Sequence, residues 1–374
     1  IGTYVKASTE RDDQVGDRSN DEVRIDASDL RARVFGEGAN LSITQRGRIE
    51  YARHGGRINQ DAIDNAAGVS TSDHEVNLKI LLTLAVEDGR LDQDGRDALL
   101  AGLADDVVAD VLRDIDQQTA ALSQEVARSP EQIDAYEQFM RRLETDGELD
   151  RAVQVLPDSE TIAGRAESGA GLLRPELATL LAWSKRELKE ALLAAPILDQ
   201  PLLQPLLADY FPDALAEQFA DLLPRHRLRH ELIATMAAND VVNRMGIAFA
   251  TSLAEQAGVP LTDVVLAYFV ARDVVGANHW WTLLESAQGT HDPQRALELE
   301  QIVDRLMARI TSTLLLEPLL RDPLALLDRD RAVAAELIDN MLTLGTPSQR
   351  RARVAHARWL VDDLVDPALA RIQA

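Results

Sequence analysis

Residues 31–59, RARVFGEGANLSITQRGRIEYARHGGRIN, decide the fold of the first part of the chain. Residues 31–35 alternate in polarity and stop at a glycine, which is the pattern of a strand. Residues 44–54 have a helical pattern and run into two glycines, which commonly end helices. Residues 57–59 can form another short strand, and residues 2–5 look like the end of an earlier one. A strand, a helix and a strand at this spacing predict a βαβ unit of a parallel sheet.

From about residue 72 onward the apolar residues recur with a helical period. Aromatic residues make up only 4% of the chain, and the dominance of Leu and Ala favours helix over strand. The sequence therefore predicts a mainly α protein. We expect a partial Rossmann-like α/β segment at residues 1–72 and an all-helical domain at residues 73–374, in which a further boundary near 150–172 stays open. The expected helix landmarks are a start near residue 72 with a stop at Gly89, a start at Pro175, an apolar face from Leu232 to Met245, and a cap at Thr262 with an end before Gly276.

Composition and charge narrow the class of protein. With 374 residues the chain is long enough for two or three domains. Its net charge of −23 argues against a nucleic-acid binder, which needs a basic face. The absence of cysteine excludes disulfides, thiolate catalysis and cysteine metal sites. No apolar run reaches membrane-spanning length, so we expect a cytoplasmic protein without a nucleic-acid or membrane partner.

The segment GEGAN at residues 36–40 is the first candidate ligand site, because it follows a predicted strand. Gly36 and Gly38 would let backbone N–H groups approach a cofactor closely, and Asn40 could hydrogen-bond a ribose or a carboxamide. The alternative is an ordinary strand-to-loop turn, since Leu41 replaces the third glycine of a dinucleotide fingerprint.

The second candidate is the run of small and polar residues 64–72, which includes Asn65 and Ser72. Free N–H groups and hydroxyls at a helix start suit a carboxylate or a phosphate. The alternative is simple helix capping by Ser70 or Ser72, with Glu75 completing a capping box. Both candidates follow strands of one βαβ unit, where open α/β sheets bind ligands.

Two other motifs are interpreted as structural. His226 and His230 are four residues apart, but HRLRH lacks the glutamate of a zinc-protease helix and adds two arginines, so we expect surface histidines and no metal site. Residues 164–171 resemble a phosphate loop only superficially, because Lys and Ser/Thr are missing at the required positions. We interpret them as a flexible connector.

Several segments in one order closely resemble the large NAD-specific glutamate dehydrogenases of bacteria. The resemblance extends from residue 1 to about residue 290. The segments that carry it are GEGANL at 36–41, TQRGRIEY at 44–51, GGRIN at 55–59, DAIDN at 61–65, SDHEVN at 72–77, LLRPEL at 172–177, WSK at 183–185, HRLR at 226–229 and ANDVVNRMG at 238–246.

Shorter hexameric glutamate dehydrogenases share the first part more distantly, and their motifs imply roles for single residues. Their A-E-G-A-N motif resembles residues 36–40 and implies that Asn40 lies near the nicotinamide ribose. Their N-A-G-G segment implies that Asn65 touches the cofactor, although Ala67 departs from glycine. Ser72 aligns with the serine that contacts the α-carboxylate of glutamate. Gly2 and Thr3 resemble a loop that passes near the dinucleotide.

The resemblance implies NAD as the cofactor and the oxidative deamination of L-glutamate to 2-oxoglutarate and ammonia. The family's catalytic Lys and Asp, glycine-rich phosphate turn and acidic ribose selector find no counterpart here. The chain begins at Ile1, and we expect these groups upstream of it, so this fragment alone should be inactive. Residues from about 90 onward would serve oligomer contacts, in a homo-oligomer, or regulation. The competing hypothesis is a helical scaffold or regulatory protein without enzymatic activity.

Overall fold

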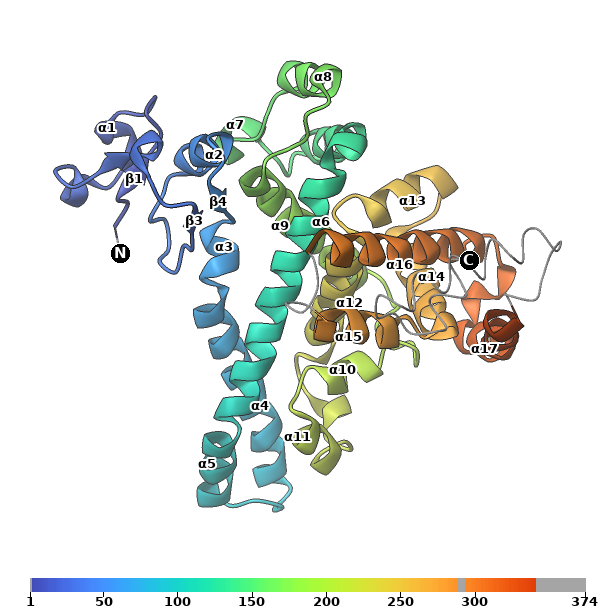
Figure 1. Ribbon diagram of the computed structural model, residues 1–374. Coiled ribbons are helices and arrows are strands. Elements are labelled where there is room, and N and C mark those ends of the chain that lie inside the picture. The colour runs from blue at the N-terminus through green and yellow to red at the C-terminus, as the bar shows by residue number, and fades with distance from the viewer. Residues whose placement is uncertain (1, 288–292, 341–374) are drawn as a thin grey trace. The chain divides into compact units, whose positions relative to one another are not determined.

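The computed structural model describes residues 2–287 and 293–340, and the chain divides into two compact units (Figure 1). Unit 1 comprises Ile1–Leu198 and Gln204–Ala248, and unit 2 comprises Asp199–Leu203 and the described residues from Phe249 onward. Within the described residues the last strand ends at Ile58, and the rest of the regular structure is helical. The predicted mainly α fold with its strands near the N-terminus is therefore confirmed.

Unit 1 begins with two pairs of parallel strands, and a helix connects the two strands of the second pair. Val34 pairs with Arg57 and Phe35 pairs with Ile58, so the predicted parallel βαβ unit is confirmed. The helix starts after Thr44, whose hydroxyl accepts a hydrogen bond from the N–H of Gly47 at 3.0 Å. The first pair of strands contains one strand that the sequence did not predict, β2. The elements are β1 (Val5–Lys6), α1 (Asp12–Val15), η1 (Arg18–Asn20), β2 (Ile25–Asp26), η2 (Ala27–Asp29), β3 (Val34–Phe35), α2 (Gln45–Arg53) and β4 (Arg57–Ile58).

A small apolar core joins α2 to both pairs of strands. Tyr51 of α2 is buried, and its hydroxyl donates to the carbonyl oxygen of Ala32 at 2.7 Å. The ring of Tyr51 leaves no room for a side chain at Gly56, where a Cβ would lie 2.3 Å from a ring carbon. This close approach explains why a glycine connects α2 to β4. The buried residues of this core are Val5, Ala27, Ile43, Tyr51 and Ile58.

Long helices follow the α/β part. Helix α4 begins at Ala66, six residues before the expected start, and it ends before Gly89, which has a left-handed φ of 70°. The predicted stop is confirmed, but capping by Ser70 or Ser72 is wrong, because Asn65 occupies the N-cap position. Ala66 and Ala67 are good helix formers, so the helix extends back through the small residues. The elements are α3 (Asp61–Asp64), α4 (Ala66–Glu87), α5 (Gln93–Gly102) and α6 (Ala104–Thr145).

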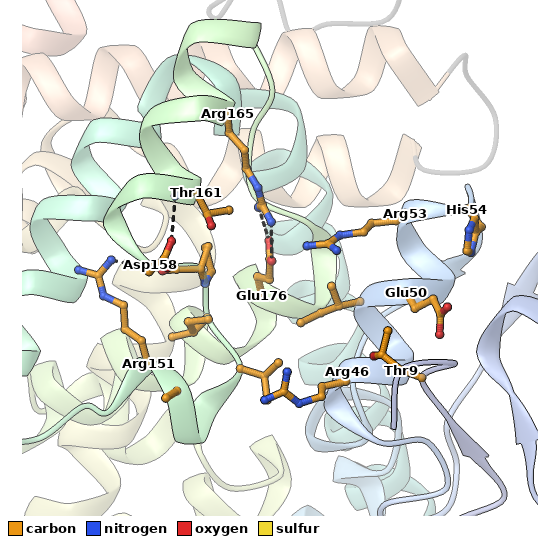
Figure 2. A pocket seen from close by; sticks show the side chains of 16 residues that line it. Thr9, Arg46, Glu50, Arg53, His54, Arg151, Asp158, Thr161, Arg165 and Glu176 are labelled. Atoms are coloured by element: carbon orange, nitrogen blue, oxygen red, sulfur yellow. Dashed lines mark hydrogen bonds and ion pairs between the residues drawn. The ribbon is translucent and has the colours of Figure 1, made fainter. Parts of the chain in front are cut away.

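The remaining helices of unit 1 pack around α9 and α12. Pro175 lies in the first turn of α9, as predicted. Residues 164–168 belong to α8, so their interpretation as a connector is wrong. A cavity of about 600 Å³ lies between α2 and the segment that carries α7 and α8 (Figure 2). The elements are α7 (Arg151–Gln154), α8 (Ser159–Ser168), α9 (Arg174–Leu193), α10 (Pro205–Asp209), α11 (Asp213–Gln218), η3 (Leu223–Arg225) and α12 (Arg229–Met245).

His226 corrects another expectation. It precedes α12 and is fully buried, whereas we expected a histidine on a helix surface. Its Nδ1 accepts from the N–H of Leu228 at 3.2 Å, and its Nε2 lies 3.2 Å from the carbonyl oxygen of Asn77. Burial lowers the pKa of His226, which favours the neutral ring. This histidine therefore has a structural role in joining α4 to the start of α12.

Unit 2 is built around α14. Val264 to Arg272 of this helix are buried without interruption, because α13, α15, α16 and α17 all contact it. The helix ends at Gly276, as predicted, but its N-cap is Pro260 and not Thr262. None of the helices in the described residues combines the length and apolar character that crossing a lipid bilayer needs. The elements are α13 (Phe249–Ala257), α14 (Leu261–Val275), α15 (Ala277–Ala287), α16 (Pro293–Leu314), η4 (Pro318–Arg321) and α17 (Pro323–Asn340).

Two helical glycines should respond oppositely to alanine. A Cβ at Gly47 would lie 3.1 Å from the backbone carbonyl carbon of Lys6 and 3.0 Å from a methyl carbon of Ile43, whereas one at Gly164 would meet nothing within 4 Å. We expect Gly164→Ala to raise the free energy of unfolding by about 1 kcal/mol through helix propensity. We expect Gly47→Ala to lower it by about 1–3 kcal/mol, because the crowding outweighs the same gain. Chemical denaturation measures both, and equal stabilisation of the two variants would contradict the packing of α2 against β1.

Candidate functional site

Asn40 and Asn65 meet at the carboxyl ends of two parallel strands. Asn40 lies in the middle of the loop between β3 and α2, and Asn65 follows β4 and α3. The Nδ2 of Asn65 donates a hydrogen bond to the Oδ1 of Asn40. Asn40 is exposed and Asn65 is half-buried, so both amides retain hydrogen-bonding capacity toward solvent or a ligand. The structure thus brings together two of the predicted site residues, although 25 positions separate them.

A buried ion pair fixes the loop that carries Asn40. Glu37 accepts hydrogen bonds from Arg48 at 2.7 Å and 2.6 Å, and the exposed fractions of these residues are 1% and 2%. Glu37 also accepts from the N–H of Ile43 at 3.2 Å. Asp61 lies 3.0 Å from the same guanidinium. These contacts clamp the loop to α2 on one side and to α3 on the other.

A second set of hydrogen bonds joins this loop to the segment before Asn65. The N–H of Glu37 donates to Asp64 at 3.0 Å, and the N–H of Leu41 donates to Asp61 at 2.8 Å. Leu41 has a left-handed φ of 57°, which is unusual for a residue with a side chain and turns the chain within the loop. Asp64 also accepts from Asn59 at 2.6 Å. The loop and the segment therefore form one connected unit.

The sequence analysis did not identify these supporting residues. Glu37, Arg48 and Asp61 all lie in segments that carry the family resemblance, but the sequence led us to assign no role to any of them. The available signal was a charged residue inside a loop otherwise made of small residues. A sequence does not show which of its many acidic residues pairs with which arginine.

Gly36 and Gly38 are exposed, and the space beside each is open. A Cβ at either position would meet nothing within 4 Å. No neighbouring atom of the chain therefore requires glycine at these two positions. Open space beside an exposed loop backbone is the arrangement that the close approach of a cofactor needs.

Gly2 and Thr3 are buried, and Thr3 makes hydrogen bonds within the chain. The N–H of Thr3 donates to Asp17 at 2.7 Å, and its hydroxyl donates to the carbonyl oxygen of Leu41 at 2.7 Å. A Cβ at Gly2 would overlap Asn20, at 2.1 Å from its amide nitrogen. This segment therefore contacts the loop that carries Asn40 through Leu41.

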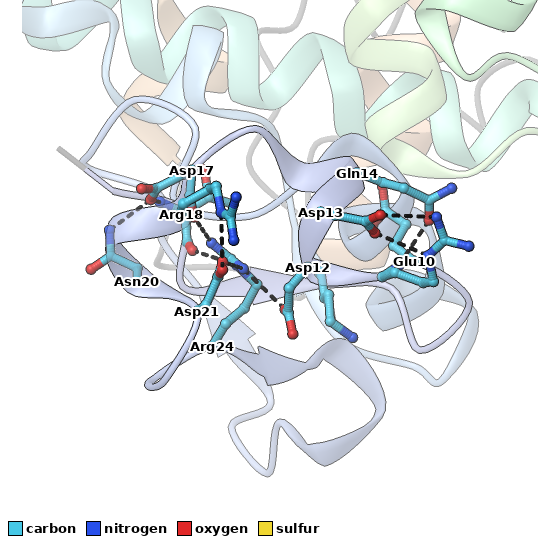
Figure 3. A network of polar contacts seen from close by, with 12 residues as sticks. Glu10, Asp12, Asp13, Gln14, Asp17, Arg18, Asn20, Asp21 and Arg24 are labelled. Carbon is cyan, nitrogen blue, oxygen red and sulfur yellow. Dashed lines mark hydrogen bonds and ion pairs between the residues drawn. The ribbon is translucent and has the colours of Figure 1, made fainter.

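A polar network holds Thr3 in this position (Figure 3). Arg24 donates to the carbonyl oxygen of Thr3 at 2.9 Å and pairs with Asp12 at 3.0 Å and Asp21 at 2.6 Å. Hydrogen bonds from Asn20 and from the backbone of Thr3 hold the pKa of Asp17 below its usual value. The carboxylate therefore stays ionised and keeps accepting both bonds at neutral pH.

Ser72 lies in the second turn of α4 and is exposed. Seven residues separate it from Asn65, which places both on the same face of the helix, about 10 Å apart along its axis. The structure does not bring Ser72 into contact with the two asparagines. It places the serine hydroxyl along the helix face that starts at them.

The chain matches two family models. Residues 1–125 match the model described as "Bacterial NAD-glutamate dehydrogenase, catalytic domain", and residues 169–374 match "Glutamate dehydrogenase, C-terminal". The second match alone covers more than half of the chain.

Three similar proteins are each named "NAD-specific glutamate dehydrogenase". The one from Pseudomonas aeruginosa is 46% identical over 286 residues, which is 76% of this chain and 18% of the relative. The one from Halomonas elongata is 40% identical over 311 residues, or 83% of this chain and 19% of the relative. The one from Mycobacterium tuberculosis is 42% identical over 287 residues, or 77% and 18%. The chain therefore spans less than a fifth of the length of these relatives.

Neutralising Glu37 should destabilise the fold. In Glu37→Gln the buried guanidinium of Arg48 keeps Asp61 but loses its main partner, so we expect the free energy of unfolding to fall by about 3 kcal/mol. Glu22 is exposed, and Glu22→Gln is the matched control, with an expected change within about 0.5 kcal/mol. Chemical denaturation of the two variants makes the comparison. Equal stability would show that the ion pair does not hold the loop.

Proposed function

Because the chain belongs to the family of bacterial NAD-specific glutamate dehydrogenases, we propose that it forms part of an enzyme that oxidatively deaminates L-glutamate to 2-oxoglutarate and ammonia with NAD as the hydride acceptor. The observation that carries the proposal to particular residues is the meeting of Asn40 and Asn65 at the ends of parallel strands. Open α/β sheets bind ligands at this edge. The alternative of a helical scaffold protein loses its support, because both matched models describe parts of a dehydrogenase.

Asn40 and Asn65 would bind the nicotinamide end of NAD. Each amide both donates and accepts, which suits a ribose hydroxyl or the nicotinamide carboxamide. Gly36 and Gly38 would let the cofactor approach the backbone, because nothing fills the space beside them. Gly2 and Thr3 would act by supporting this loop through Leu41. In this proposal the parallel β3–α2–β4 unit is the end of a Rossmann-like domain that closes near residue 72.

Ser72 would bind the α-carboxylate of glutamate. Its hydroxyl lies on the face of α4 that starts at Asn65, so a substrate beside the nicotinamide can reach it. We assign no catalytic residue to this chain, because none of its segments resembles the family's catalytic Lys and Asp.

The helical remainder would serve assembly or regulation of the enzyme. From α5 onward no segment matches a cofactor or substrate motif. We propose that these helices contribute contacts in a homo-oligomer or respond to an effector, and that the enzyme acts in the cytoplasm. Family membership supports this proposal, because the second matched model begins at residue 169, in the helical part.

Asn65→Ala in the active enzyme should mainly weaken the binding of NAD. Loss of one hydrogen-bonding amide should raise the KM for NAD about fivefold, since a neutral hydrogen bond contributes about 1 kcal/mol. Asn278 lies exposed in α15, and Asn278→Ala is the matched control. Steady-state kinetics at saturating glutamate measures the effect. An unchanged KM for NAD would exclude Asn65 from the cofactor site.

Ser72→Ala should mainly weaken the binding of glutamate. A hydrogen bond to a carboxylate contributes about 1.5–3 kcal/mol, so the KM for glutamate should rise about 10- to 100-fold while the KM for NAD stays close to normal. Ser70 lies on a different face of α4, and Ser70→Ala should leave both constants unchanged. Normal glutamate dependence of the Ser72 variant would leave this serine without a role in binding.

A further inference from the structure

The cavity beside α2 is separate from the proposed NAD and glutamate site. It lies within unit 1, has a volume of about 600 Å³, and is lined by the outer side of α2 together with α7, α8 and the loop between them. None of the residues that we assign to NAD or glutamate lines it. A volume of this size accommodates a small metabolite.

The acidic side chains in the cavity wall already have donors. Glu176 pairs with Arg165 through two contacts of 2.6 Å and 2.9 Å. Glu50 accepts from the N–H of Ser8 at 2.6 Å, and Asp158 accepts from the N–H of Thr161 at 2.8 Å. Each carboxylate therefore accepts hydrogen bonds from within the chain, so the cavity wall does not require a bound cation.

Two arginines of the cavity wall, in contrast, have no partner within the described residues. Arg46 and Arg53 are exposed, and within the described residues their side chains make no hydrogen bond or ion pair. They are seven residues apart on α2 and so lie on one face of the helix, with about 10 Å between their backbone positions. In Figure 2 both extend from α2 toward the segment that carries Asp158 and Thr161. The cavity thus holds two unpaired positive charges on a chain whose net charge is −23.

Arg151, a third arginine of the cavity wall, is used within the chain. Its side chain is 7% exposed and pairs with Glu137 at 2.6 Å and Glu144 at 2.9 Å. Its Nη2 has no hydrogen-bond partner in the described structure, but this atom is itself buried and so is not offered to a ligand in the cavity. Arg46 and Arg53 are therefore the arginines of this cavity that are free to bind a ligand.

We propose that this cavity binds a small organic anion that carries at least two carboxylate or phosphate groups. Guanidinium groups match both kinds of group through paired, charge-assisted hydrogen bonds. Two separated arginines select an anion with two charged ends. Ile49, Val155 and Leu156 supply an apolar wall for the carbon skeleton between them.

The position of the cavity suits a regulatory ligand. The anion would bridge α2 and the segment around α8. Helix α2 also carries Arg48, which holds the loop of Asn40 through Glu37. A ligand in the cavity therefore acts on the helix that positions this loop.

The test is calorimetric titration of the intact protein with two probes, sodium pyrophosphate and sodium succinate, at constant ionic strength. We expect at least one probe to bind with a submillimolar dissociation constant. Arg46→Gln and Arg53→Gln should each weaken it about tenfold or more, because a charge-assisted bond is lost. Arg31 is also exposed, and its side chain makes no hydrogen bond or ion pair in the described structure, so Arg31→Gln is the matched control with unchanged affinity.

The pattern of binding distinguishes the outcomes. Binding of pyrophosphate alone assigns a phosphorylated ligand, and binding of succinate assigns a dicarboxylate. The proposal is overturned if neither probe binds in this range, if the two variants bind like the unchanged protein, or if Arg31→Gln weakens binding equally. The substituted side chains are exposed and unpartnered, so circular dichroism should show unchanged folding. NAD binding by the Arg53 variant separates this proposal from that of the NAD site.

Discussion

The buried pair of Glu37 and Arg48 constrains the part of the structure on which the candidate site depends. Both charged groups are removed from water, and each is tolerable only because the other is present. The loop after β3 can therefore close only where Arg48 presents its guanidinium, which is one face of α2. Asn40 follows Glu37 by three residues and is placed by this closure. Asp61 shares the guanidinium and brings the segment before Asn65 to the same point.

Buried supporting residues and exposed functional residues are thus kept apart in the candidate site. Glu37, Arg48 and Tyr51 are inaccessible, and their partners lie within the chain. Asn40 and Ser72 are exposed, and their side-chain amide and hydroxyl groups can still form hydrogen bonds with a ligand. Binding groups placed on a rigid support keep their geometry without a ligand, which lowers the ordering cost of binding.

Helix α2 contacts the strands, α9 and the cavity through different faces. Arg48 and Tyr51 contact the strands and their loops, whereas Gln45 donates to the carbonyl oxygen of Pro175 at 3.1 Å and so contacts α9. Arg46 and Arg53 face the cavity. A helix of nine residues with contacts on all these sides has little freedom to move alone. A ligand at one face therefore acts on the others through packing.

Features that arise within a few residues could be predicted from the sequence alone. The helix at residues 44–54, the parallel unit around it, Pro175 at a helix start and the stop at Gly276 were predicted correctly, because helix ends and apolar periods are local. Tertiary packing determines the start of α4 at Ala66, the pairing that creates β2, and the burial of His226 against Asn77, 149 positions away. It also decided which acidic residue neutralises Arg48. Such outcomes depend on which distant groups share one buried space, and local propensity does not encode that choice.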